Sequence, residues 1–434
     1  MPELTVLIYI LITVVTIWLG IHEYGRWINH ITIYGVVWGT QIILFEMKFI
    51  AYPNLSSETI IFIFGTWIVF VVSSLTFRRF YSDQKSAVQE LPIGGNNVLL
   101  VILLGFTLIG AAGTYQHWMV LIRLFGSIKS VILSGNIIYS AERSETGIPG
   151  MWPYVDSIGL SADFLGGYFA GFRRRPIFLG IIPVVVELAN AVSGFGRSRF
   201  IIGVVLWTSA FFLPQMRRRV TDKNALIKRL ALFSTIVLIF IFGMETVRAF
   251  RATNESFTGE TSSLSRIKGI GFITPSVYMY LSSDVAVLNK FLDYQFSGKV
   301  EHTPIGGYTF GPFFRFFSKF GLVDPMPVYE KFYSVPVTTN TGSYLREIYA
   351  DWGLWGSLLI VYLLGAICSV AYETYRRKKS LASLSILAHL YIVVFFTFAL
   401  FGTNWTYWLI SLVASLAAGT VLDKSSYQKE GNVG

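Results

Sequence analysis

Long uncharged stretches dominate this chain. Residues 4–21, 59–77 and 97–116 each form a run without a charged side chain. A helix that crosses a bilayer needs about 20 mainly apolar residues, and hydrocarbon accepts only helices or closed barrels because every backbone polar group must be paired internally. With 53% hydrophobic and 14% charged residues, the chain is more apolar than soluble domains are. The sequence therefore predicts an all-α polytopic membrane protein and excludes a soluble core.

The apolar runs divide the chain into three parts. Residues 1–248 form a first bundle of spans, residues 249–349 a large, partly helical outer loop, and residues 350–434 the last spans with a tail. The first run lacks a preceding basic region and a following small-residue cleavage site, so we expect a retained helix. The expected spans, about eleven in all, are 4–21, 32–50, 59–77, 97–116, 154–172, 177–193, 200–215, 230–248, 350–371, 382–401 and 405–421.

Basic clusters fix the expected orientation. They fall on alternate connections between spans, which places them all on one side, the cytoplasm by the positive-inside rule. The N-terminus and residues 249–349 then face outward, and the tail faces inward. The net charge of +10 therefore reflects anchoring and topology and does not indicate nucleic acid. The clusters are Arg78, Arg79 and Lys85; Arg173–Arg175; Arg217–Arg219 with Lys223, Lys228 and Arg229; and Arg376–Lys379.

Two arginines lie on the outer side, where short loops carry few basic residues. Arg197 and Arg199 belong to the segment 193–199, SGFGRSR, between two expected spans. Its glycines and serines leave the turn open, so backbone N–H groups and the next helix start can face an anion. Two guanidinium groups bind phosphate oxygens bidentately. The segment predicts a phosphate or diphosphate site, and the alternative is contact with lipid headgroups or outer-loop carboxylates.

Two further polar groups flank the long loop, so folding can bring them beside Arg197. Glu245, Arg248 and Arg251 are spaced three apart on one helical face. For Glu245 with Arg248 the alternative is an ordinary ion pair. The second group, near the start of the expected span 350–371, consists of Arg346, Glu347 and Asp351. For Asp351 the alternative is helix N-capping.

The long loop also contains a candidate base and an amphipathic helix. His302 is its lone histidine, and an unperturbed pKa near 6.5 suits a general base; simple exposure is the alternative. An interfacial helix is predicted by Phe313, Phe316, Phe317 and Phe320 opposite Arg315 and Lys319.

Two further features lie outside the long loop. Residues 118–135 resemble a weaker amphipathic helix. Glu187, about 15 Å along the helix from Arg197 at 1.5 Å per residue, is expected to pack or to pair with another helix.

Several function classes are excluded. No glycine-rich nucleotide loop precedes a helix, no carboxylate–metal cluster occurs, and no basic groove with stacking aromatics faces the cytoplasm. We therefore expect no cofactor, no metal and no nucleic-acid partner. The substrate should arrive already activated, from the membrane.

The layout and a few short segments resemble bacterial O-antigen polymerases, also called oligosaccharide repeat unit polymerases or Wzy-type proteins. The resemblance rests on the many spans, the late outer loop, the arginine turn, and the segments TNT at 339–341 and YADWGLWG at 349–356. It implies transfer of a growing glycan from undecaprenyl diphosphate to another lipid-linked repeat unit, outside a bacterial inner membrane. It also implies a GT-C-like fold, metal-independent glycosyl transfer, and a chain-length regulator and a flippase as partners.

Residue roles follow from this resemblance together with the charge pattern. Arg197 and Arg199 are expected to bind the diphosphate, with Arg346 or Arg248 assisting. The base that takes the acceptor proton is expected among His302, Glu347 and Asp351. An O-antigen ligase, which uses another acceptor, and a flippase for lipid-linked sugars are the alternatives. Against a flippase, we find no inverted repeat and no paired broken helices, and the polar residues gather at the outer rim.

Overall fold

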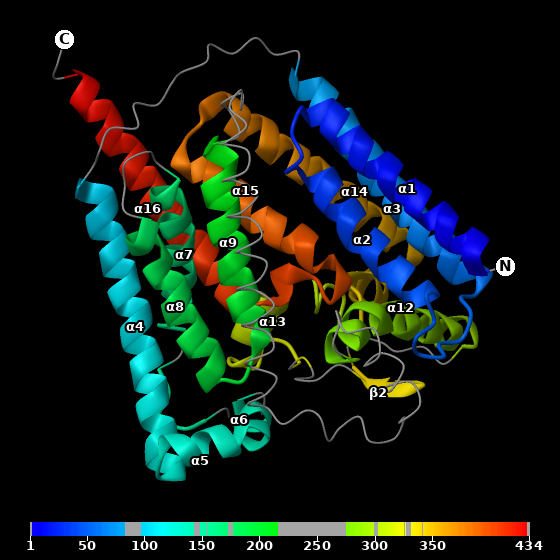
Figure 1. Ribbon diagram of the computed structural model, residues 1–434, viewed down its shortest axis with the longest axis horizontal. Coiled ribbons are helices and arrows are strands. Elements are labelled where there is room, and N and C mark those ends of the chain that lie inside the picture. The colour runs from blue at the N-terminus through cyan, green and yellow to red at the C-terminus, as the bar shows by residue number, and fades with distance from the viewer. Residues whose placement is uncertain are drawn as a thin grey trace. The chain divides into compact units, whose positions relative to one another are not determined.

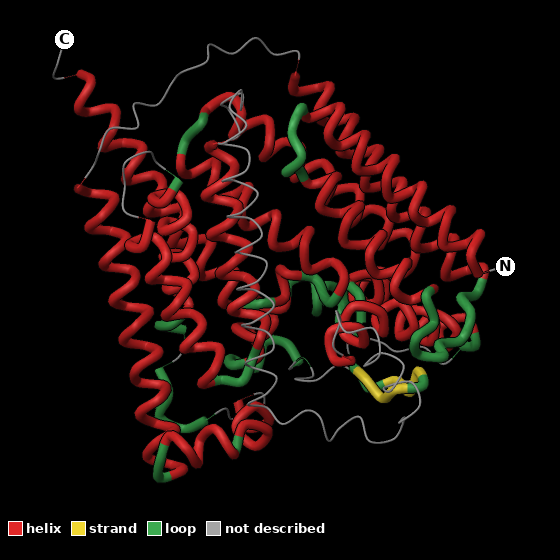
Figure 2. Tube along the Cα trace, in the orientation of Figure 1, coloured by secondary structure: helices red, strands yellow, loops and turns green. Residues whose placement is uncertain are grey.

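The computed structural model describes residues 2–82, 97–142, 148–152, 154–171, 177–215, 275–298, 303–324, 326, 331–340 and 342–431. Within these residues the chain is helical except for one short hairpin and connecting turns (Figures 1 and 2). Antiparallel strands β1 (Tyr333–Val335) and β2 (Val337–Thr339) form that hairpin. The expected span 230–248, Arg248 and His302 lie outside the described residues.

The described helices agree with the predicted class, an all-α membrane protein. Seven of them are long and apolar enough to cross a membrane, and Ile177–Ser193 is a shorter apolar helix. The predicted count of about eleven and the GT-C-like arrangement stay predictions. The candidate spans are Thr5–Tyr24, Ser57–Tyr81, Asn97–Phe125, Arg197–Gln215, Tyr344–Lys378, Leu381–Phe398 and Thr406–Ser425.

The chain divides into two compact units. Unit 1 comprises residues 1–87, 256–377 and 390–406, and unit 2 comprises residues 88–255, 378–389 and 407–434. Residues 256–349 of the expected outer loop therefore share one unit with the first and ninth expected spans. Contacts between residues far apart in sequence, rather than the order of spans, decide this division.

In unit 1, buried aromatic residues make polar contacts with side chains of other helices. The Tyr34 hydroxyl lies 2.9 Å from that of Tyr344, and Trp38 Nε1 donates to Thr397 Oγ1 at 3.2 Å. Such contacts stabilise a membrane bundle because no water competes for the donors. The helices are α1 (Pro2–Tyr24), α2 (His30–Glu46), α3 (Ser57–Ser82), α12 (Pro275–Phe296), α13 (Gly311–Ser318), α14 (Tyr344–Lys378) and the short η2 (Phe396–Phe398) and η3 (Gly402–Asn404).

Unit 2 packs its helices through glycines. A Cβ on Gly167 of α7 would lie 2.1 Å from the carbonyl oxygen of Trp207 on α9, and one on Gly166 would lie 2.4 Å from that of Gly180 on α8. Small residues at such positions let helix backbones approach closely. The helices are α4 (Asn97–Phe125), α5 (Ile128–Leu133), α6 (Gly135–Glu142), α7 (Ser157–Ala170), α8 (Ile177–Ser193), α9 (Arg197–Gln215) and α16 (Thr406–Gly431), while α15 (Leu381–Phe395) contributes its first part.

The amphipathic segments are only partly as predicted. Residues 118–125 continue α4, and α5 and α6 then follow as separate short helices beyond its end (Figure 1). The 118–135 helix was therefore wrong as a single element. The predicted aromatic helix is present as α13, whose Phe313, Phe316 and Phe317 are exposed, while Arg315 donates to Asn404 Oδ1 at 3.1 Å.

Candidate functional site

The arginine turn is shorter than its sequence suggested. Helix α8 ends at Ser193 and α9 begins at Arg197, which leaves residues 194–196 as the connection. Phe195 adopts a left-handed backbone conformation with φ of 50°, which is uncommon for a residue with a side chain. Both arginines therefore stand in the first turn of α9, where unpaired backbone N–H groups favour an anion.

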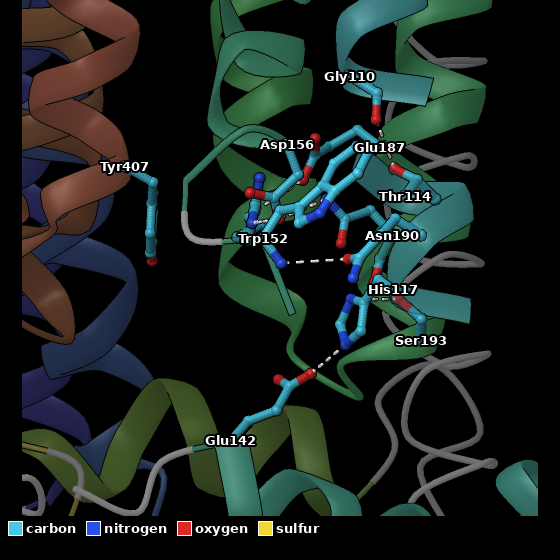
Figure 3. A network of polar contacts seen from close by, with 12 residues as sticks. Gly110, Thr114, His117, Glu142, Trp152, Asp156, Glu187, Asn190, Ser193 and Tyr407 are labelled. Atoms are coloured by element: carbon cyan, nitrogen blue, oxygen red, sulfur yellow. Dashed lines mark hydrogen bonds and ion pairs between the residues drawn. The ribbon is translucent and has the colours of Figure 1, made fainter. Parts of the chain in front are cut away.

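Arg199 is fixed inside unit 2 by two carboxylates. Its Nε donates to Glu187 Oε1 at 3.1 Å, and its Nη1 pairs with Asp156 Oδ2. Figure 3 shows Asp156 and Glu187 side by side in this network. The expected separation of about 15 Å referred to Glu187 and Arg197 and stays a prediction, whereas the long Arg199 side chain does reach Glu187. The expectation that Glu187 pairs with another helix is confirmed.

The network also restrains Asp156, which precedes α7. Asn190 Nδ2 donates to its Oδ2 at 3.1 Å. Burial raises the pKa of Asp156, but the Arg199 guanidinium and the Asn190 amide outweigh burial, so this pKa lies below its usual value. Asp156 is therefore an ionised partner of Arg199 at neutral pH.

Arg199 keeps one donor for a further ligand. Its Nη2 is buried and has no hydrogen-bond partner among the described residues. The ring of Tyr407 lies over the guanidinium, with 5.4 Å between Cζ and the ring centroid. A buried donor without a partner is costly, and an anionic oxygen would satisfy it. Arg197 is half-buried in the same turn.

A second polar group meets the same turn, and the sequence analysis missed it. His117 of α4 has Nδ1 3.0 Å from Ser193 Oγ and Nε2 2.7 Å from Glu142 Oε1. The latter is an ion-pair contact rather than a well-aligned hydrogen bond. Figure 3 shows the line from Glu142 through His117 to Ser193. The available signal was a histidine and a glutamate at the ends of otherwise apolar or small-residue segments.

Asp163 is a third carboxylate close to this network. It is fully buried in the middle of α7, and neither carboxylate oxygen has a hydrogen-bond partner among the described residues. A Cβ on Gly203 would lie 2.4 Å from Asp163 Oδ2 and 3.3 Å from Glu187 Cγ, so both acidic side chains border this glycine. The polar groups of unit 2 therefore extend into the helices, as the position of Asp163 in the middle of α7 shows.

In unit 1 the predicted residues of α14 are buried together. Arg346 and Glu347 occupy its first turn and are 4% and 0% exposed. Glu347 Oε2 accepts the backbone N–H of Phe401. Asp284 of α12, also buried, accepts from Gln41 Nε2 at 3.2 Å. Burial raises the pKa of Asp284 well above its usual value, against the opposing effects of Arg346 and Gln41.

The Asp351 carboxylate accepts hydrogen bonds from residues 303, 308 and 309. Its Oδ1 accepts from the Tyr308 N–H at 3.1 Å and from Thr303 Oγ1 at 3.3 Å. Its Oδ2 accepts from both the N–H and the hydroxyl of Thr309, each at 2.8 Å. Asp351 therefore lies within α14 rather than capping it, and it positions the loop by these hydrogen bonds. Nearby, α14 is interrupted at Gly353, with φ of 65° and ψ of −169°.

The two predicted groups thus lie in different units, with Arg197 and Arg199 in unit 2 and Arg346, Glu347 and Asp351 in unit 1. Within the described residues, no group of acidic, histidine or cysteine side chains could hold a metal ion. The arrangement in unit 2 suits an anion held by guanidinium and helix-start donors beside partly exposed acid–base side chains.

Comparison with known proteins adds no assignment. No protein family, curated protein or solved structure matched the chain.

Proposed function

We propose that this chain is a glycan polymerase, a metal-independent glycosyltransferase that joins oligosaccharide units carried on undecaprenyl diphosphate. The observation that carries the proposal is the arginine turn. Arg199 is held by Asp156 and Glu187, yet its buried Nη2 has no partner among the described residues. A diphosphate oxygen would supply that partner at the start of α9.

The proposed glycosyl transfer requires two contributions from the protein, charge stabilisation and one proton acceptor. The bond between the sugar and the diphosphate oxygen breaks, and its electron pair stays on the diphosphate. Preorganised donors that face this developing charge lower the barrier, usually by more than any other single effect. Arg199 needs little reorganisation, because its ion pairs already set its position.

The resemblance to repeat unit polymerases supplies the substrate class. In the proposed orientation the site faces the outside of a bacterial inner membrane, and membrane lipid, a chain-length regulator and a flippase are the expected partners. Arg346 and Glu347 stay candidates for assisting the diphosphate and for the base, as do Arg248 and His302 outside the described residues. Asp351 is better suited to positioning, since both of its oxygens already accept hydrogen bonds.

The test is glycan ladder formation in membranes given purified lipid-linked repeat units. Arg197→Ala and Arg199→Lys are compared with Arg123→Ala, a control arginine exposed on α4 of the same unit. We expect long ladders from the parent and the control, and none from the other variants at equal protein level. Arg199→Lys is preferred to alanine because it retains a cation beside the buried carboxylates. Transfer to lipid A core without ladders would instead indicate a ligase.

A transporter for lipid-linked sugars is the second candidate, and Asp163 favours it. An ionisable side chain buried in a membrane helix is a functional candidate by default, and both oxygens of Asp163 lack hydrogen-bond partners among the described residues. Movement of a lipid-linked sugar across vesicles, lost in Asp163→Asn and unaccompanied by ladders, would favour this function over polymerisation.

A further inference from the structure

We infer that Glu142 is the base that accepts the acceptor-hydroxyl proton and that His117 positions it; this rests on the proposed function. Neither residue was a candidate from the sequence. Both belong to unit 2, as the arginine turn does.

The Glu142 carboxylate lies against Gly194 of the arginine turn. A Cβ on Gly194 would lie 2.7 Å from Glu142 Oε2 and 3.1 Å from Oε1. A side chain at position 194 would therefore displace the Glu142 carboxylate from its present place. Gly194 is also the residue between Ser193, which contacts His117, and the segment that leads to Arg197. The Glu142 carboxylate and the proposed diphosphate donors therefore border the same short turn, residues 194–196.

The Glu142 side chain is more exposed than Glu347 and Asp351, the two carboxylates that the sequence predicted as bases. The side chains of Glu142 and His117 are 24% and 12% exposed, so an acceptor hydroxyl can reach them. Glu347 is completely buried, and Asp351 is occupied by hydrogen bonds from Tyr308 and Thr309. A base must come within about 3 Å of the proton that it removes, and among these carboxylates Glu142 meets that condition most readily.

The contacts of His117 suit a positioning role. Ser193 Oγ donates its own proton to the Asn190 carbonyl oxygen at 2.7 Å, so His117 Nδ1 donates to Ser193 Oγ. In the imidazolium form of the ring, Nε2 also carries a proton, which faces Glu142 Oε1. This holds one carboxylate oxygen and leaves the other for the acceptor. The acceptor O–H proton then moves to the free Glu142 oxygen as the acceptor oxygen bonds to the sugar carbon. The diphosphate leaves with the electron pair of the broken bond, so atoms and charge balance.

The experiment measures initial rates of ladder formation by the purified full chain in liposomes with lipid-linked repeat units. Glu142→Gln should lower kcat by roughly 100- to 10,000-fold, the usual contribution of a general base, with little change in the KM for the donor. Glu142→Asp should recover part of the rate. His117→Gln should lower kcat less than Glu142→Gln does and also leave the donor KM unchanged. Glu58→Gln, an exposed glutamate on α3, is the matched control.

The outcomes separate this inference from the proposed function. A parent that makes no ladder overturns the proposed function, and the inference falls with it. A parent that makes ladders while Glu142→Gln keeps its kcat overturns the inference alone. If Glu142→Gln does not fold, Glu142→Asp decides, because a folded variant with unchanged kcat and a raised KM would show a binding role instead. The same rates in Glu347→Gln test the buried alternative directly.

Discussion

At the scale of single residues, Arg199 balances charges that burial would otherwise make unfavourable. Replacing it by methionine leaves Glu187 and Asp156 without their cation, and losing one partner of a buried pair costs about 3–5 kcal/mol. We expect a clear fall in the unfolding temperature of Arg199→Met. Adding Glu187→Gln should restore part of the loss, because one uncompensated carboxylate disappears.

Thermal unfolding in detergent checks this prediction, with Arg123→Met as the exposed control. Equal unfolding temperatures for Arg199→Met and the control would show that water reaches the two carboxylates and solvates them. A double variant less stable than Arg199→Met would contradict the charge-balance argument.

Asp351 carries a second prediction at this scale. The Thr309 N–H donates to Asp351 Oδ2 at 2.8 Å, and Asp351→Asn cannot offer two acceptor oxygens. Hydrogen bonds to charged groups contribute about 1.5–3 kcal/mol, so amide exchange at Tyr308 and Thr309 should accelerate by roughly 10-fold or more. Hydrogen exchange with mass spectrometry measures it. Asp324→Asn, at an exposed position, should leave these amides unchanged, and equal protection in both variants would refute the positioning role.

Sequence alone identified some of these residues and missed others for a physical reason. The arginine turn was found because two guanidinium groups between apolar runs violate the charge pattern of short outer loops. Glu142 and His117 have no such signature, since their relation depends on how α4, α6 and α8 pack. Glu187 was recognised as a pairing residue, but its distance to Arg199 depends on side-chain reach, which spacing along one helix does not give.

At the scale of elements, the close packing of α7 gives a matched pair of substitutions. A Cβ on Gly167 would lie 2.1 Å from the Trp207 carbonyl oxygen, whereas one on Gly105 of α4 would meet nothing within 4 Å. Gly167→Ala should therefore cost about 1–3 kcal/mol through overpacking. Gly105→Ala should be neutral or stabilising, because alanine favours helix more than glycine does.

Unfolding temperatures of the two alanine variants test the packing of α7 against α9. A substantial fall for Gly167→Ala with no fall for Gly105→Ala is the expected result. Equal behaviour of the two would mean that the helices separate enough to admit a methyl group, and the close backbone approach would be wrong.

The elements themselves were predicted better than their ends. Apolar runs located most described helices, because burial in lipid requires uninterrupted apolar surface. Helix α14, however, begins at Tyr344 rather than near residue 350, since Arg346 and Glu347 are polar yet buried. The hairpin 333–339 was not predicted, because strands of three residues leave almost no periodic pattern.

At the scale of the whole molecule, contacts within each unit bring together helix ends that the charge pattern predicted to share one side of a membrane. Arg78 pairs with Glu23 near the end of α1 and approaches Glu373 near the end of α14 at 4.0 Å. The clusters that begin at Arg78 and at Arg376 therefore lie at one end of unit 1. Within unit 2, His117 and Ser193 likewise bring the later parts of α4 and α8 together. Each pair of ends was expected to share one side of the membrane.

This agreement makes the orientation testable with single cysteines. The only native cysteine is Cys368, so Cys368→Ala gives a cysteine-free background, to which Lys129→Cys or Lys424→Cys is added; both lysines are exposed. The connection after α4 is predicted to face outward and the tail inward, because basic clusters remain on the cytoplasmic side. A membrane-impermeant maleimide should label Lys129→Cys in intact cells and Lys424→Cys only after permeabilisation. The reverse pattern would place the arginine turn on the cytoplasmic side, where a carrier-linked glycan delivered outside the membrane could not reach it.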